Sequence, residues 1–314
     1  MPSQALESGI HQSLPGAIVE RLEHIIVGKR HEVELALACL LAGGHLLIED
    51  LPGVGKTTLA HALAAVLGLR FQRIQFTSDL LPADVLGVSV YDRETGEFHF
   101  HPGPVFAQLV LADEINRATP KTQSALLEAM EEGQITLEGE TRALPRPFFV
   151  IATQNPAHQI GTFPLPESQL DRFLMRISLG YPARGAERAL LRGADRRTLL
   201  QDLRPVTDVQ QLEELQRHVH GIHVSDAVLD YVQALVDHTR HSGRFEHGLS
   251  PRAALALLRA ARAWAGLRGR DYLLPDDVQA VFVPVAAHRL QARGTAGPAG
   301  TETVGRVLEE VEVP

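Results

Sequence analysis

The sequence predicts an α/β fold with a parallel sheet in its first part and a smaller all-α domain after it. Short apolar runs at residues 109–112 and 148–152 are typical of strands buried on both faces, as in parallel sheets. A glycine-rich loop at 52–57 joins another such run to a helix-like run. Beyond residue 182 the β pattern gives way to helical periods, so we place the domain boundary near residue 185.

The elements of the first part follow from hydrophobic period and turn residues. Thr119 and Pro120 have the chemistry of a helix start, and Gly133 ends that helix. Turn residues at 94–96 and 138–140 separate alternating runs and so predict two hairpins. In chain order we expect a helix at 29–41, a strand at 45–48, a helix at 58–67, a strand at 71–76, a hairpin at 88–100, a strand at 109–112, a helix at 119–133, a hairpin at 135–143 and a strand at 148–152.

The second part is predicted to be helical. Ser250 and Pro251 fit the N-cap and first turn of a helix, which places Arg252 in that turn. The last residues are rich in Gly, Thr, Ala and Glu, and we expect a mobile tail there. The predicted domains are 1–185, 186–293 and the tail 294–314, with helices at 187–200, 209–218, 227–238 and 252–264.

Composition narrows the class of protein. The chain has 314 residues, 45% of them hydrophobic, and no apolar run reaches the ~18 residues that a membrane span needs. No signal peptide is apparent, and the single cysteine, Cys39, excludes an intrachain disulfide, so we expect a cytoplasmic protein. The net charge of -8 disfavours a broad nucleic-acid surface.

The loop at 52–57 is the most informative segment, because a strand, a glycine loop and a helix together form a phosphate-binding P-loop. Lys56 is suited to the β- and γ-phosphates, and Thr57 offers a hydroxyl to Mg²⁺. The usual first glycine is replaced by Asp50, and a chance glycine-rich turn is the alternative interpretation. The expected ATP-binding residues here are Pro52, Gly53, Val54, Gly55, Lys56, Thr57 and Thr58.

A second acidic motif strengthens the first. Residues 109–114 read as a buried strand that ends in Asp113 and Glu114, as expected of a Walker-B strand beside a P-loop. Asp113 is expected to hold Mg²⁺ with Thr57, while Glu114 orients and deprotonates the attacking water. The alternative is an ordinary strand that meets a solvated loop.

Histidines suggest a metal site that the spacing does not support. His218, His220 and His223 form a local cluster, and His99 and His101 share one face of a predicted strand. Neither spacing matches a familiar zinc pattern, and no nearby cysteine completes a site. We therefore expect solvated or hydrogen-bonded histidines.

Over about residues 25–290 the chain resembles the AAA+ ATPases, and within them the MoxR family of chaperone-like ATPases. The segment 49–57 looks like the MoxR form of the P-loop, in which the first glycine is also missing. The two hairpins resemble the helix-2 insert and the pre-sensor-1 insert of this group. The resemblance implies an AAA+ P-loop core with a helical lid, on the segments 111–118 (Walker B), 152–156 (sensor 1), 165–173 (arginine finger) and 248–253 (sensor 2).

The resemblance also implies roles for five residues. Asn155 positions the lytic water, Arg172 acts on a neighbour's ATP, and Arg252 acts in cis from the lid. Val27 and Gly28 line the adenine pocket. Cations at the γ-phosphate suit the charge that accumulates there in phosphoryl transfer. Alternatives remain, since Asn155 also suits a turn before a proline, and either arginine also suits a surface salt bridge.

The implied function is Mg-ATP hydrolysis by a homo-oligomer, a hexameric ring, that remodels a protein client. The family suggests a client with a von Willebrand A domain, in the maturation of a protein complex. One competing hypothesis is an AAA+ motor that acts on nucleic acid, which the acidic turn at 92–97 and the lack of an appended DNA-binding module disfavour. The other is a nonhydrolysing nucleotide-gated scaffold, which Glu114 disfavours.

Overall fold

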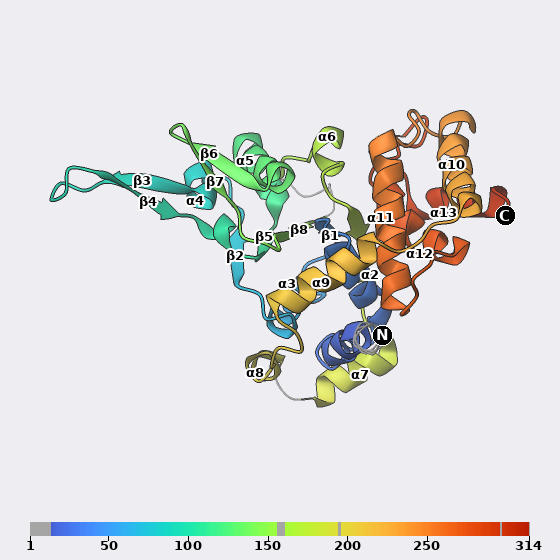
Figure 1. Cartoon of the computed structure of the whole chain (residues 1–314), viewed down its shortest axis with the longest axis horizontal. Helices are drawn as coiled ribbons and strands as arrows, with labels where there is room; N and C mark the ends of the chain where they lie inside the picture. Colours follow the sequence, from blue (N-terminus) through green and yellow to red (C-terminus); the bar gives the residue numbers. More distant parts are fainter. Residues whose placement is uncertain (1–13, 156–160, 194–195, 296, 314) are drawn as a thin grey trace, which may run out of the picture.

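The computed structural model describes residues 14–155, 161–193, 196–295 and 297–313. Predictions that fall on the other positions, among them Pro156, lie outside the described residues. Figure 1 shows an α/β core whose two-stranded hairpin β3–β4 projects from one end, with the helices α10 to α13 gathered at the other. Among the described residues, no helix is both long and apolar enough to cross a membrane.

The core is a five-stranded parallel sheet in the order β2-β5-β8-β1-β9. This confirms the α/β class and the parallel sheet expected from the apolar runs. β1, β5 and β8 are adjacent in the sheet, so their carboxyl ends meet at one edge. The strands are β1 (Leu46–Glu49), β2 (Phe71–Gln75), β5 (Leu109–Asp113), β8 (Phe149–Gln154) and β9 (Met175–Ile177).

Two apolar clusters cover the two faces of the sheet, because successive strand residues point to opposite sides. Leu46 and Ile48 belong to one cluster, together with residues of α2 and α3 and of the C-terminal helices. Leu47 belongs to the other, together with residues of α5. These three helices are α2 (Arg30–Leu41), α3 (Lys56–Val66) and α5 (Pro120–Glu132).

Both predicted hairpins are present. β3 (Gly87–Tyr91) pairs antiparallel with β4 (Phe98–Pro102) after a short helix, α4 (Pro82–Leu86), that was not predicted. β6 (Gln134–Leu137) pairs with β7 (Glu140–Ala143) directly after α5. α5 begins and ends where the sequence predicts, with Thr119 at the N-cap and Gly133 in the left-handed conformation after it.

The helices after β9 differ from the prediction in two places. The continuous helix expected at 187–200 is wrong, because α7 ends at Arg192 and Gly193 adopts an extended conformation. α7 has no buried residue that would hold a longer helix in place. The helices are α7 (Arg184–Arg192), α8 (Arg196–Gln201), α9 (Val209–His220), α10 (Asp226–His241), α11 (Pro251–Leu267), α12 (Pro275–Ala286) and α13 (Thr301–Glu310).

The mobile tail expected at 294–314 is also corrected. Residues 301–310 form α13, and Val304 and Val307 are buried against the C-terminal helices. Spaced three residues apart, these valines share one helix face. Their burial outweighs the polar composition of the segment.

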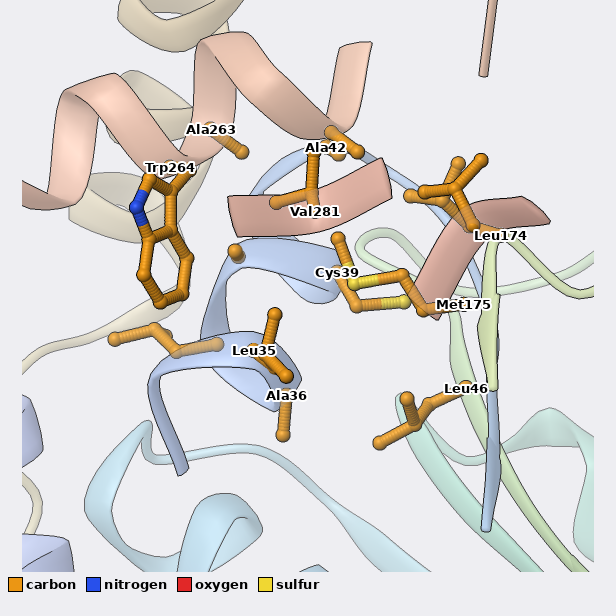
Figure 2. Close-up of a cluster of buried hydrophobic side chains, with 14 of the residues drawn as sticks. Leu35, Ala36, Cys39, Ala42, Leu46, Leu174, Met175, Ala263, Trp264 and Val281 are labelled. Carbon is orange, nitrogen blue, oxygen red and sulfur yellow. The ribbon is translucent and has the colours of Figure 1, made fainter. Parts of the chain in front are cut away.

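The C-terminal helices pack directly on the core. Figure 2 shows Cys39 of α2 and Met175 of β9 in one cluster with Val281 of α12 and Trp264 of α11. Burial raises the pKa of the Cys39 thiol, so this side chain is an inert core residue. An ion pair reinforces the packing, because Arg268 after α11 donates from both terminal nitrogens to Glu34 of α2, at 3.0 and 2.8 Å.

Candidate active site at the phosphate-binding loop

The loop after β1 has the conformation that phosphate binding requires. Gly53 and Gly55 have φ values of 87° and 98°, in the left-handed region that glycine adopts at low cost. α3 starts at Lys56, so its N-terminus faces the loop. Lys56 Nζ donates to the carbonyls of Asp50 (2.5 Å) and Leu51 (3.1 Å), and burial lowers the pKa of this amine. The lysine is thus drawn into the loop and is surrounded by oxygen acceptors.

Asp50, at the position of the motif's first glycine, has a carboxylate with three hydrogen-bond donors. Its carboxylate accepts hydrogen bonds from the Leu51 amide (2.8 Å), the Ser178 hydroxyl (2.9 Å) and the Gly180 amide (2.6 Å). Burial alone would raise the pKa of Asp50, but the bonds from Gly180, Leu51 and Ser178 outweigh it and lower the pKa. Asp50 therefore ties the start of the loop to the segment that follows β9.

The end of β5 carries two carboxylates, Asp113 and Glu114, which are held by different sets of hydrogen bonds that share Thr153. Asp113 Oδ1 accepts from the Thr153 hydroxyl of β8 at 2.6 Å, and Oδ2 accepts from Arg73 of β2 at 2.6 and 3.1 Å. The same Thr153 oxygen accepts from the Glu114 amide at 2.8 Å. Glu114 itself has a φ of 56°, which is uncommon for a residue other than glycine. That bend turns the Glu114 side chain out of the strand direction.

Asn155 and Glu114 meet, as a water-positioning pair requires. Asn155 follows β8 and is buried, and its amide donates to Glu114 Oε1 at 3.2 Å. Glu114 Oε2 accepts from Gln75 of β2 at 3.3 Å and lies 2.8 Å from Arg117 Nε. Arg117 and Gln75 thus hold one carboxylate oxygen, while Asn155 holds the other.

These groups line one hollow of about 290 Å³ at the carboxyl edge of the sheet. Among the described residues that line it, Lys56 is the one cation, facing Asp113 and Glu114. The Thr57 hydroxyl and the Asp113 carboxylate are hard oxygen donors of the kind that Mg²⁺ prefers, so the residues fit that ion. The hollow is lined by Pro52, Gly53, Gly55, Lys56, Thr57, Thr58, Asp113, Glu114 and Asn155.

The remaining predicted binding residues lie outside this lining. Val54 belongs to the same loop and packs partly against the larger apolar cluster. Gly28 has a φ of 74° and approaches α7 so closely that an added Cβ would lie 2.7 Å from Ala186 Cβ. Val27 precedes it, and Lys29 Nζ donates to the Tyr181 carbonyl at 3.0 Å. The pair is therefore held beside the segment to which Asp50 is tied.

The structure places both arginines of the sequence prediction elsewhere. Arg172 Nη2 lies 3.1 Å from Glu131 Oε2, and Arg252 Nη1 lies 3.0 Å from Glu131 Oε1. They line a separate hollow of about 180 Å³, together with Asp171 and Arg289. No P-loop residue lines that hollow. The cis role expected for Arg252 stays a prediction, since in this structure Arg252 lies beside Arg172 and lines a different hollow.

Sequence reasoning missed the residues that hold the carboxylates. Thr153 lies within the sensor-1 segment, but nothing in its type distinguishes it there. Arg73 and Gln75 alternate along β2, and Gln75 is paired with Asp113 in the parallel register. Once that strand pairing is known, period-two spacing puts both side chains on the Asp113 side.

The histidine clusters have ordinary partners. His218 Nε2 lies 3.2 Å from Asp271 Oδ1, and His220 Nδ1 lies 2.6 Å from the Gln216 carbonyl. His99 Nε2 lies 3.2 Å from the Thr95 hydroxyl. Within the described ranges, no group of three or more His, Cys, Asp or Glu side chains is arranged to hold a metal ion.

Comparisons with known proteins agree with this geometry. Residues 45–175 match the model of the ATPase family associated with various cellular activities (AAA), and residues 237–311 match an AAA lid domain. The Chaperone MoxR1 of Mycobacterium tuberculosis (strain ATCC 25618 / H37Rv) is 41% identical, over 99% of this chain and 85% of that protein. The chain belongs to the MoxR family of AAA+ ATPases.

Two further relatives cover this MoxR-family protein almost end to end. The Bacillus subtilis (strain 168) protein YeaC is 46% identical, over 99% of this chain and 98% of YeaC. A solved structure of a candidate ATPase from Cytophaga hutchinsonii superposes with a TM-score of 0.89 at 34% identity, and covers 100% of this chain and 98% of its own. The AAA core and the lid are therefore those of this family.

Proposed function

We propose that this protein binds Mg-ATP at the P-loop and hydrolyses it to ADP and phosphate. The observation that carries the proposal is the meeting of Lys56, Asp113, Glu114 and Asn155 in one hollow, from three adjacent parallel strands and the loop after β1. A phosphate-binding loop, a metal carboxylate and a base carboxylate held by an amide are the parts that phosphoryl transfer to water needs. The AAA family match supports the same substrate.

Each residue then has one task. The loop amides and Lys56 hold the phosphates, with the loop segment 52–58 around them, and Thr57 and Asp113 hold Mg²⁺, whose charge offsets that of the phosphates. Glu114 takes a proton from water as the water oxygen bonds to the γ-phosphorus, and the bond from that phosphorus to the β–γ bridging oxygen breaks. Asn155 keeps the Glu114 carboxylate aimed at the water. Val27 and Gly28 are assigned to the adenine side.

We further propose a ring in which Arg172 and Arg252 both reach the ATP of the neighbouring subunit. Support comes from their shared contact with Glu131 and from the hollow that they line, which includes no P-loop residue. Cations from a neighbour stabilise the charge on the γ-phosphate oxygens in the transition state. A hexamer, as expected from the family resemblance, is the assembly that we propose.

The proposed outcome of hydrolysis is the remodelling of a protein client. The name Chaperone MoxR1 of the Mycobacterium relative supports this class of work, and the projecting β3–β4 hairpin offers a surface for it. A client with a von Willebrand A domain and a cytoplasmic location stay proposals from the resemblance. The nucleic-acid motor is the second candidate, and it predicts ATPase stimulation by DNA or RNA.

The test separates binding from chemistry. Lys56→Ala is expected to abolish binding of a fluorescent ATP analogue, because the lysine holds ground-state phosphate. Glu114→Gln is expected to bind the analogue normally and to lose turnover by about 10³-fold. Hydrolysis by Glu114→Gln at the wild-type rate would contradict the base assignment. A wild-type protein that binds the analogue but hydrolyses no ATP would favour the scaffold hypothesis instead.

A further inference from the structure

Arg289 is a buried arginine whose contacts the sequence motifs do not explain. It lies in the turn after α12, and only 6% of its side chain is exposed. Its five N–H donors are all engaged: Nε donates to Asp171 Oδ1 (2.6 Å), Nη1 to the carbonyls of Leu174 (3.1 Å) and Val285, and Nη2 to the carbonyls of Asp171 (3.2 Å) and Phe173 (2.6 Å).

Four of those five bonds go to the short segment 171–174, between α6 (Glu167–Leu170) and β9. Arg172 stands inside this segment, with acceptors of Arg289 on the residues before and after it. His288 adds a second clamp, since its Nε2 lies 3.0 Å from the Phe173 carbonyl. Arg289 and His288 thus hold the backbone around Arg172 through hydrogen bonds, while the Arg172 side chain extends to Glu131.

The contacts of Arg289 also lead to Arg252, through Asp171. Asp171 receives Arg289 on Oδ1, and its Oδ2 lies 3.7 Å from Arg252 Nε. Arg252 and Arg172 meet again on Glu131. One chain of contacts therefore runs from the turn after α12 to both arginines at the proposed subunit interface.

A buried cation with complete hydrogen bonding is a poor choice for stability alone. Ordinary apolar packing would avoid the desolvation cost of a guanidinium, which a buried pair often does no more than offset. What the planar, five-donor fork supplies is geometry, because it fixes several acceptors relative to one another. Lysine carries the same charge but has three donors on a flexible stem, so it cannot reproduce the set.

We infer that Arg289 is a positioning residue for the arginine finger: it fixes the segment 171–174 to the lid, so that movement of α12 moves Arg172 relative to the neighbour's ATP. This inference rests on the proposed trans role of Arg172. It adds a residue and a route by which the lid of one subunit acts on hydrolysis in the next.

The experiment uses the full chain and mixed subunits. Arg289→Lys is expected to bind ATP normally and to hydrolyse it about 10²-fold more slowly, since a misplacement of about 1 Å costs that much. Mixing it with Glu114→Gln subunits is expected to restore activity, because a mixed interface combines intact Glu114 with an intact, correctly held finger. Mixing it with Arg172→Ala is expected to restore nothing, since both proteins lack a working finger.

Arg270→Lys is the matched control. Arg270 is also a lid arginine whose two terminal nitrogens bind one carboxylate, that of Asp277, but it contacts no residue of 171–174 in the described structure. Its ATPase rate is expected to stay within about twofold of the wild type. If Arg289→Lys melts far below the control, Asp171→Asn takes its place, because it removes the Arg289 carboxylate partner and is expected to show the same mixing pattern.

Two results overturn the inference while the trans role of Arg172 still stands. One is a folded Arg289→Lys protein with wild-type turnover. The other is a loss of turnover that Glu114→Gln subunits fail to restore while they do restore Arg172→Ala, since that pattern marks a defect in the variant's own nucleotide site. Normal turnover in Arg172→Ala would instead contradict the proposed trans finger, and with it the inference.

Discussion

Two hollows of the molecule differ in the charge of the residues that line them: the P-loop hollow and the hollow that Arg172 and Arg252 line, here called the arginine hollow. The first is lined by one cation, Lys56, and two carboxylates, Asp113 and Glu114. The second is lined by four arginines, at positions 172, 252, 259 and 289, and two carboxylates, Glu131 and Asp171. A phosphate group bound in the first hollow leaves its γ-oxygens in need of further cations, and the second hollow has cations in excess. Under the proposed trans role of the arginines, one subunit would carry two complementary halves of an ATPase site.

The two halves are also held in different ways. Carboxylates of the P-loop hollow are fixed by strand neighbours, such as Thr153 and Arg73, across adjacent strands. Cations of the arginine hollow are held by the lid, through Arg289, and by the carboxylates of Glu131 and Asp171. Domain movement changes contacts between domains more than contacts within a sheet, so we expect control of hydrolysis from the arginine half.

The largest effect is expected from removing the finger. Arg172→Ala should leave ATP binding intact and lower turnover by about 10³-fold, the lower end of the range for arginine fingers. Mixing with Glu114→Gln should restore part of the activity, since one mixed interface joins both intact halves. Steady-state ATPase assays on the pure and mixed proteins measure this. Unchanged turnover in Arg172→Ala alone would break the comparison.

Next in size is the bridge between the two carboxylates. Thr153→Val removes the hydroxyl that donates to Asp113 and accepts from the Glu114 amide, with little change in volume. We expect turnover to fall by about 10²-fold, because both the metal ligand and the base lose their alignment. Mixing with Glu114→Gln subunits should not restore turnover. These subunits supply an intact Arg172, but the defect of Thr153→Val lies beside the variant's own ATP.

The positive control for this mixing experiment is the mixture of Arg172→Ala with Glu114→Gln. Glu114→Gln supplies fingers to Thr153→Val sites and leaves their defect in place, whereas it supplies fingers to Arg172→Ala sites and completes them. Equal restoration of both variants would show that the two hollows do not divide the work as proposed.

A smaller effect should reveal on which ATP Arg252 acts. Arg252→Ala is expected to lower turnover by about tenfold, because Arg172 still supplies one cation. If Arg252 acts in trans, Glu114→Gln subunits restore the activity, and if it acts in cis they do not. Hydrogen exchange at residues 248–256 with a nonhydrolysable analogue adds a second measurement. Nucleotide-dependent protection in isolated subunits would favour the cis role first expected from the sequence.

Local sequence motifs predicted the residues of the P-loop hollow but not the contacts that form the arginine hollow. Asp113 and Glu114 stand at the end of one predicted strand and Lys56 in the glycine loop after another, so the adjacency of these strands brings the three together. Arg289 and Asp171 lie 118 positions apart in sequence, and nothing near either residue signals the contact. The place of Arg252 in the first turn of α11 was predictable from Ser250 and Pro251, whereas its contacts with Glu131 and Asp171 depend on how the lid packs on the core. α13 shows the opposite error, where composition hid two valines on one helix face.

Replacement of Asp50 is expected to have a smaller effect, a pH-dependent loss in the stability of the fold. Asp50→Asn keeps the size but weakens three hydrogen bonds, at a cost of about 1–3 kcal/mol in the free energy of unfolding. The pKa of Asp50 is lower in the folded protein than in the unfolded chain, so its stabilisation is present above about pH 4 and is lost as the pH falls through the folded value. Urea unfolding of both proteins should show a constant difference above about pH 5 that shrinks below pH 4. A difference independent of pH would contradict this.

The smallest effect on ATPase is expected from the β3–β4 hairpin, which contributes no residue to either hollow. Its surface is nevertheless apolar for an exposed element: Tyr91 and Phe98 are 52% and 69% exposed and pack on each other with ring centroids 5.2 Å apart. Replacing residues 92–97 by Asn-Gly should keep the strand pairing, because that turn suits a two-residue hairpin loop.

Basal turnover and assembly of the shortened protein should therefore stay near the wild-type values, while remodelling of a client, or stimulation of ATPase by it, should be lost. Basal ATPase, sedimentation and client conversion measured side by side check this. β6 and β7 are joined by only two residues, Glu138 and Gly139, so that turn cannot be shortened, and the substitution Glu138→Asn at its tip serves as the control. If the first variant remodels its client normally and the control does not, client work belongs to β6–β7. ATPase chemistry and client engagement would still lie on separate parts of the molecule, because neither hairpin tip lines the P-loop hollow or the arginine hollow.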